Sequence, residues 1–113
     1  MNNYSELGDI KARLPFEVDS KSYPTESELQ DIQDNITRFI NAYIGTDKTS
    51  SAPDGLRWVE TELAAQDALV YHREGTILFT DLTKKHKQIL DDHRSTKVVD
   101  IEEFEWSLNY NQW

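Results

Sequence analysis

The segment PTESELQDIQDNITRFINAYIG, Pro24–Gly45, carries the clearest structural signals in the chain. Thr25 is a good N-cap, because its hydroxyl can accept from a free N–H of the first turn, and Glu28 three residues later completes a capping box. Gly45 supplies the left-handed residue that commonly ends a helix. Apolar residues recur between these ends at spacings of three and four, which predicts one long amphipathic helix; they are Leu29, Ile32, Ile36, Phe39, Ile40, Tyr43 and Ile44.

Three further helices are predicted around this one. A short helix begins at Ser5 and stops before Pro15, because the residue that precedes a proline disfavours helical geometry. A third helix covers residues 56–74 and stops at Gly75. Residues 46–55, between the second and third helices, are turn formers without periodicity and are predicted to be an exposed loop. A fourth helix is predicted to begin after Thr80 as its N-cap and to continue to about Arg94. Its apolar residues are Leu82, Ile89 and Leu90.

The last part of the chain has a different pattern. From Phe104 to Tyr110 apolar and polar residues alternate, which is the period of a strand. A single strand lacks a partner within this chain, so we predict that it adds to another copy or another protein; folding back on the helices and disorder are the alternatives. The predicted fold is all-α, a small bundle of about four helices in residues 1–94, with an extended C-terminal arm in residues 95–113.

Length and composition limit the function classes. A chain of 113 residues with 37% hydrophobic residues is predicted to form one small domain with a modest core. No apolar run approaches the ~20 residues that cross a bilayer, and the first residues lack the pattern of a secretory signal, so we expect a cytoplasmic protein without membrane contact. The absence of cysteine excludes disulfides, thiolate zinc sites and a cysteine nucleophile.

Groups that could support catalysis are few. His86 and His93 are two helical turns apart, about 10 Å, which is too far for both to bind one ion. His72 lies on another predicted helix, and all three histidines are interpreted as ordinary polar or edge residues. The pairs Asp91–Asp92 and Glu102–Glu103 are adjacent and therefore point in different directions. We predict no catalytic residue, no metal ligand and no cofactor, and hence a protein that is not an enzyme.

The charge balance favours protein partners over nucleic acid. The chain has 21 acidic and 12 basic residues, a net charge of −9, which repels phosphate backbones. The basic exceptions Lys84, Lys85 and Lys87 are interpreted as solvated, with Lys85 able to pair with Asp81 four residues earlier. Their functional alternative is a subunit interface, because copies with acidic and basic patches on opposite flanks can pack head to tail into a ring.

Part of the sequence resembles one protein family. Residues 10–14 (Ile-Lys-Ala-Arg-Leu), the break after them, Pro24 and the following run with Glu28-Leu29 are similar to the head–tail connector (adaptor) proteins of tailed viruses. The isoleucines at 32, 36 and 40 belong to the same similarity. It continues more loosely through residues 63–65 (Leu-Ala-Ala) and residues 82–90.

The resemblance implies a structural virion protein at the capsid–tail junction, assembled in the host cytoplasm. Proteins of this family form a homo-oligomeric ring, expected here to be dodecameric, that docks beneath the portal protein. A tail-proximal connector or tail-completion protein is the expected second partner, and DNA passes through without specific binding. The C-terminal arm is expected to contact the portal, and its anchors would be the aromatic and apolar side chains, which dominate interface free energies: Phe104, Trp106, Leu108, Tyr110 and Trp113.

An acidic inhibitor or DNA mimic, such as an antitoxin that binds a basic protein, is the alternative. It explains the net charge and the C-terminal arm equally well. It does not explain the pattern of Pro24–Gly45 or the Ala-Arg-Leu-Pro run at 12–15. The two hypotheses differ in assembly, because a connector forms a large ring whereas an inhibitor forms a small stoichiometric complex.

Overall fold

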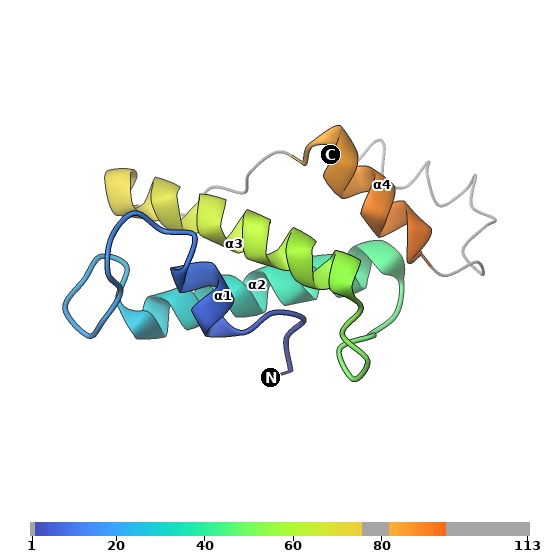
Figure 1. The fold of residues 1–113 in the computed structure, drawn as a ribbon, viewed down its shortest axis with the longest axis horizontal. Helices are drawn as coiled ribbons and strands as arrows, with labels where there is room; N and C mark the ends of the chain where they lie inside the picture. Colours follow the sequence, from blue (N-terminus) through green and yellow to red (C-terminus); the bar gives the residue numbers. More distant parts are fainter. Residues whose placement is uncertain (1, 76–81, 95–113) are drawn as a thin grey trace.

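The computed structural model describes residues 2–75 and 82–94, which form four α-helices and no strand (Figure 1). The helices are α1 (Leu7–Lys11), α2 (Glu26–Ile44), α3 (Asp54–Glu74) and α4 (Lys84–Asp92). The long helices α2 and α3 run antiparallel along the body, and α1 and α4 each contact both of them. The prediction of an all-α bundle of about four helices is confirmed. The C-terminal arm, with its anchors from Phe104 to Trp113, lies outside the described residues.

The helix α2 has the predicted ends and the predicted buried face. Thr25 Oγ1 accepts from the Glu28 N–H at 3.2 Å, and Glu28 Oε1 accepts from the Thr25 N–H at 2.8 Å, which completes the capping box. Gly45 has a left-handed conformation with φ 81° and donates its N–H to the Asn41 carbonyl. Five apolar residues of this face are fully buried: Leu29, Ile32, Ile36, Ile40 and Ile44.

The helices α1 and α3 differ from prediction at their first turns. The helix α1 begins at Leu7 rather than Ser5, because the N–H and hydroxyl of Ser5 are used in a contact with α3. The helix α3 begins at Asp54 and so includes Gly55, which was predicted to be loop. A Cβ at Gly55 would lie 3.0 Å from Ile89 Cγ2, so this glycine allows α4 to approach α3 closely. The end of α3 at Gly75, with φ 73°, is as predicted.

The start of α4 corrects the predicted cap. The N-cap is Thr83, not Thr80, and Leu82 therefore precedes the helix. Thr83 Oγ1 accepts from the His86 N–H at 3.1 Å, and His86 Nδ1 accepts from the Thr83 N–H at 3.2 Å. This reciprocal pair was missed because the usual capping box has Glu or Gln at the third position rather than His. The helix ends at Asp92, two residues before the predicted end.

The core lies between α2 and α3, and the short helices α1 and α4 pack against it. On α3 the buried apolar residues include Leu56, Val59 and Leu63, together with two alanines, Ala64 and Ala68. Ile10 from α1 and Leu90 from α4 are fully buried in the same cluster. The short helices are therefore held by burial of apolar side chains against the long pair, which is how most helices in proteins are stabilised.

A polar cluster lies inside this core and is centred on Glu60 of α3, which is fully buried. Glu60 Oε2 accepts from the Tyr4 N–H at 3.1 Å, the Ser5 N–H at 2.7 Å and the Ser5 hydroxyl at 2.5 Å. Its Oε1 contacts the hydroxyl of Thr37 on α2. Gln33 of α2 donates to the Ser5 carbonyl at 2.8 Å. One carboxyl group therefore fixes the N-terminal segment against both long helices.

The hydrogen bonds of this cluster are all satisfied when Glu60 is protonated. Thr37 Oγ1 receives a hydrogen bond from Asn3 Nδ2 at 2.8 Å and lies 3.1 Å from the Gln33 carbonyl. A hydroxyl has one proton, so Thr37 can donate to that carbonyl only if Glu60 Oε1 carries a proton and donates it to Thr37. Burial raises the pKa of Glu60, although the hydrogen bonds that Ser5 donates to the carboxyl group oppose the rise.

The substitution Glu60→Gln tests this protonation state. A glutamine amide has the shape of a protonated glutamate, so it can donate to Thr37 while its carbonyl accepts from Tyr4 and Ser5. A raised folded-state pKa stabilises the protein below the unfolded-state pKa and loses that contribution as pH rises through the folded-state pKa. In urea unfolding we expect the variant to match the wild type below about pH 4.5 and to exceed it by about 1–2 kcal/mol near pH 8.

The matched control is Glu60→Leu. Leucine leaves the N–H groups of Tyr4 and Ser5 without an acceptor, so we expect a loss of about 2–4 kcal/mol at every pH. A free-energy difference between the wild type and Glu60→Gln that stays constant from acid to neutral pH would contradict the protonated assignment.

Candidate functional site

The predicted interface lysines occupy the first turn of α4. Lys84, Lys85 and Lys87 are all exposed, in agreement with their interpretation as solvated residues. Their predicted neighbour Asp81 lies outside the described residues. Lys85 Nζ lies 5.1 Å from the ring centroid of Trp58 on α3, within the range of a cation–π contact. Within residues 2–75 and 82–94, none of these lysines forms an ion pair with a carboxylate.

Trp58 connects these lysines to a hollow between α1 and α3. The hollow has a volume of about 570 Å³ and is lined by Trp58, by two exposed arginines and by four smaller or acidic residues: Arg13, Arg57, Asp9, Ala12, Asp54 and Thr61. Arg57 donates to Asp9 from Nε at 3.0 Å and from Nη2 at 3.1 Å. These hydrogen bonds hold the pKa of Asp9 below its usual value.

We use the name cationic face for the surface made by Arg13, Arg57, Trp58, Lys84, Lys85 and Lys87. Trp58 lines the hollow with both arginines and also contacts α4 through Lys85. Lys84 and Lys87 continue this surface around the first turn of α4, and Lys87 lies on the flank towards α2, where Asp91 one turn later contacts Tyr43. Each arginine has one carboxylate partner, whereas the lysines have none among the described residues. The face is therefore a local excess of positive charge on a chain whose net charge is −9.

A buried link between α3 and α4 supports the cationic face. His86 is fully buried, and its ring lies 5.2 Å from that of Trp58. Its Nδ1 accepts from Thr83, so Nε2 carries the proton and donates to Glu62 Oε1 at 3.4 Å. Glu62 Oε2 also accepts from Arg13 at 2.5 Å. The interpretation of His86 as an edge residue is thus corrected: it is a core residue that positions α4.

The charges of α4 oppose its helix dipole. Its first turn has three lysines and no acidic residue, and its last turn has Asp91 and Asp92 and no basic residue. Helices are stabilised by the reverse arrangement, with anions near the N-terminus and cations near the C-terminus. Packing of His86 and Leu90, both fully buried, therefore has to hold α4 in place. The lysines do not serve the stability of the helix that carries them.

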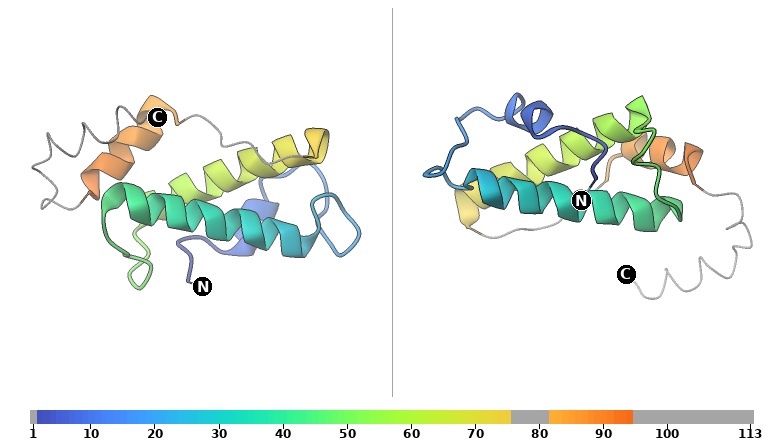
Figure 2. Two further views of the ribbon diagram at one scale, coloured as in Figure 1. Left: turned by 180° about the vertical axis from the view of Figure 1, so that it is seen from behind. Right: turned by 90° about the horizontal axis from the view of Figure 1, so that it is seen from below.

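Acidic side chains gather at the other end of the body. Glu26 and Asp31 are exposed on the first turns of α2, and Glu17 and Asp19 are exposed in the loop before it. Figure 2 shows in both views that the first turns of α2 and the whole of α4 lie at opposite ends of the bundle. We call the four carboxylates the acidic end. Glu26 pairs with Lys11 within the copy, but the lysines of α4 are too far away to pair with these carboxylates.

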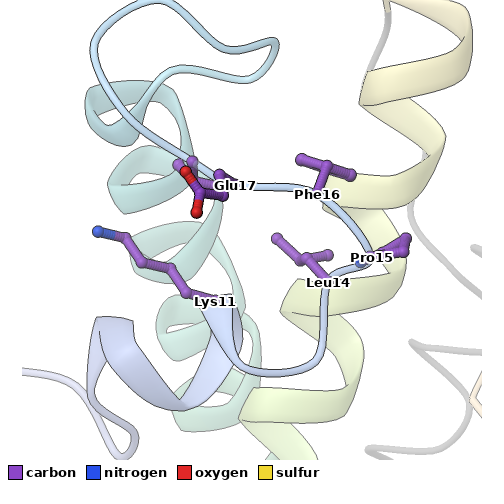
Figure 3. Close-up of a pocket in the computed structure, with 6 residues that line it drawn as sticks. Lys11, Leu14, Pro15, Phe16 and Glu17 are labelled. Atoms are coloured by element: carbon purple, nitrogen blue, oxygen red, sulfur yellow. The ribbon is translucent and has the colours of Figure 1, made fainter.

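A second hollow, of about 590 Å³, lies where the chain leaves α1 (Figure 3). Lys11 and Glu17 are on one side of it, and Leu14, Pro15 and Phe16 are on the other. Lys11 forms an ion pair with Glu26. The hollow is open and brings together no set of groups that could act as nucleophile and base.

The histidines are separated, as the sequence suggested. His72 Nδ1 lies 2.6 Å from the Tyr23 carbonyl, and its ring stacks on Phe16 at 4.0 Å. His93 is half-buried at the end of α4, and burial lowers its pKa, with the charge of Lys48 adding to this effect. Across residues 2–75 and 82–94, no three His, Asp or Glu side chains are grouped as metal ligands. None of the helices in that part of the chain is long and apolar enough to span a bilayer.

The residues that sequence reasoning missed are Trp58, Glu62, Arg13 and Arg57. The four-residue spacing of Trp58 and Glu62 was a usable signal, because it places both on one face of a helix. Arg13 reaches that face from the turn after α1, and its approach depends on how α1 packs on α3. The packing of α1 on α3 cannot be predicted from any pattern along the sequence.

The substitution Glu62→Ala tests the link between α3 and α4. It leaves the buried Nε2–H of His86 without its acceptor and Arg13 without its ion pair. We expect a loss of about 1–2 kcal/mol in urea unfolding. The control is Glu74→Ala, an exposed glutamate at the end of the same helix, which should change stability by less than about 0.5 kcal/mol. Equal losses in the two variants would contradict the role of Glu62.

No known protein family, curated protein or solved structure matches this chain. The candidate site is therefore defined by its geometry, with the lysines of the cationic face at one end of the bundle and the acidic end at the other.

Proposed function

We propose that the protein is a structural virion protein, a head–tail connector (adaptor) that forms a ring between the portal and the tail. The observation that carries this proposal is the placement of the α4 lysines of the cationic face and of the acidic end at opposite ends of one small helical body. The similarity of residues 10–14 and Pro24–Gly45 to connector proteins points to the same function.

Opposite charges at opposite ends favour head-to-tail contact between identical copies. Such a contact is heterologous, and it closes into a ring when the rotation between neighbours permits. In the proposed ring, expected to be dodecameric, Lys84 and Lys87 of one copy face Glu17 and Asp31 of the next. Complementary charges of this kind orient the encounter and fix the register of the subunits.

The other contacts of the proposed connector involve the rest of the chain. Residues 95–113 follow α4, and their aromatic and apolar side chains are proposed to bind the portal protein. A tail-proximal connector or tail-completion protein would bind the opposite side of the ring. The net charge of −9 lets DNA pass without tight phosphate contacts, because like charges repel.

Charge reversal tests the subunit contact. The double variant Lys84→Glu/Lys87→Glu places like charges opposite the acidic end of the next copy, so we expect it to lose ring assembly on the purified portal of the same virus. Adding Glu17→Lys/Asp31→Lys to the same chain restores opposite charges and should restore rings. Native mass spectrometry and electron microscopy measure the assembly.

The control for this experiment is Arg38→Glu, an exposed charge reversal on α2 that lies outside both the cationic face and the acidic end. It should form rings as the wild type does. Loss of rings in the control, or normal rings in Lys84→Glu/Lys87→Glu, would contradict the proposed interface. A small complex of fixed stoichiometry with a basic protein, and no ring with portal, would instead support the acidic inhibitor.

A further inference from the structure

The cationic face is built to receive an anionic partner that also carries aromatic groups. Its three lysines have no carboxylate partner among the residues that the structure describes. Trp58 lies between Lys85 and the arginine-lined hollow, and this half-buried residue leaves surface for an apolar contact. Lysine charges together with an accessible indole fit an acidic peptide with aromatic side chains better than they fit a simple anion.

The same chain contains such a peptide. Residues 100–106 read Asp-Ile-Glu-Glu-Phe-Glu-Trp, with four carboxylates and two aromatic side chains among seven residues. This is the most acidic stretch of its length in the sequence, and it begins six residues after Arg94, where the described part of the chain ends. Charge complementarity therefore favours this segment as the partner of the cationic face.

The length of the connection permits the contact within one copy. The nine residues of α4 span about 13 Å, so the last turn is that far from the lysines of the first turn. Residues 95–99 can bridge at most about 17 Å. The acidic segment can therefore return along α4 and reach Lys84 and Lys85, beside Trp58. A short tether also gives the segment a high effective concentration at the face.

We propose that residues 100–106 bind the cationic face of their own chain. The carboxylates of the segment pair with the lysines of α4, and its aromatic side chains contact Trp58. The contact does not depend on the connector function. If that function holds, the segment covers the proposed subunit interface of a free copy, and a neighbouring copy has to displace it before the ring can form.

Engineered disulfides in the full-length chain test this proposal, because the natural sequence has no cysteine to interfere. The pair Lys84→Cys/Glu102→Cys joins the first turn of α4 to the acidic segment. The matched control, Ser27→Cys/Glu102→Cys, joins the same segment to an exposed position at the start of α2, at the other end of the bundle. Helical circular dichroism verifies that both variants fold, and mass spectrometry distinguishes disulfides within one chain from those between chains.

We expect the Lys84–Glu102 pair to form an intrachain disulfide about tenfold faster than the control at low salt. Half-molar salt should remove most of this advantage, because screening weakens exposed charge pairs. Adding Asp100→Lys/Glu103→Lys/Glu105→Lys should remove it at any salt concentration. Equal rates in the two pairs, or an advantage that survives both treatments, would overturn the proposal. Predominant interchain disulfides would place the segment on a second copy and overturn the intrachain contact.

Discussion

The burial of one carboxyl group, that of Glu60, determines how the parts of this bundle fit together. Glu60 holds the backbone of Tyr4 and Ser5 against α3 and contacts Thr37 of α2. With Tyr4 fixed, its hydroxyl reaches both Asn41 of α2, at 2.5 Å, and the N–H of Lys48 in the following loop, at 2.9 Å. The N-terminal segment thus clamps α2, α3 and the loop between them. A buried carboxyl group is tolerated here because every lone pair and proton has a partner.

The parts of the fold that could be predicted are those encoded by neighbours in sequence. Thr25, Glu28 and Gly45 define the ends of α2 through contacts within a few residues, and the structure confirms each of them. Glu60 could not be identified in this way, because its donors Tyr4 and Ser5 lie 56 and 55 residues away. In the sequence it is simply a charged residue on a helix, and such residues are almost always exposed.

The candidate site also combines features that sequence neighbours encode with features that depend on contacts between distant elements. The exposure of the lysines on α4 follows from a run of charged residues and was predicted. The contact of Lys85 with Trp58 and the inclusion of Arg57 in the same surface require α1, α3 and α4 to be placed first. The burial of His86 was missed for a related reason. His86 lies among three lysines in the sequence. Successive residues of a helical turn point in different directions, so a residue flanked by exposed lysines can still face the core.

The stability of α4 and the occupancy of the cationic face are physically coupled. Three lysines in the first turn repel one another and oppose the helix dipole, so the unoccupied helix is weaker than its packing alone would make it. An anionic partner reduces this repulsion and places negative charge where the dipole favours it. Any ligand that binds the folded state alone also stabilises that state. Occupation of the face, by the chain's own acidic segment or by a neighbouring copy, therefore strengthens the attachment of α4 through His86 and Leu90. An unfavourable charge pattern in the isolated helix becomes a favourable one in the complex.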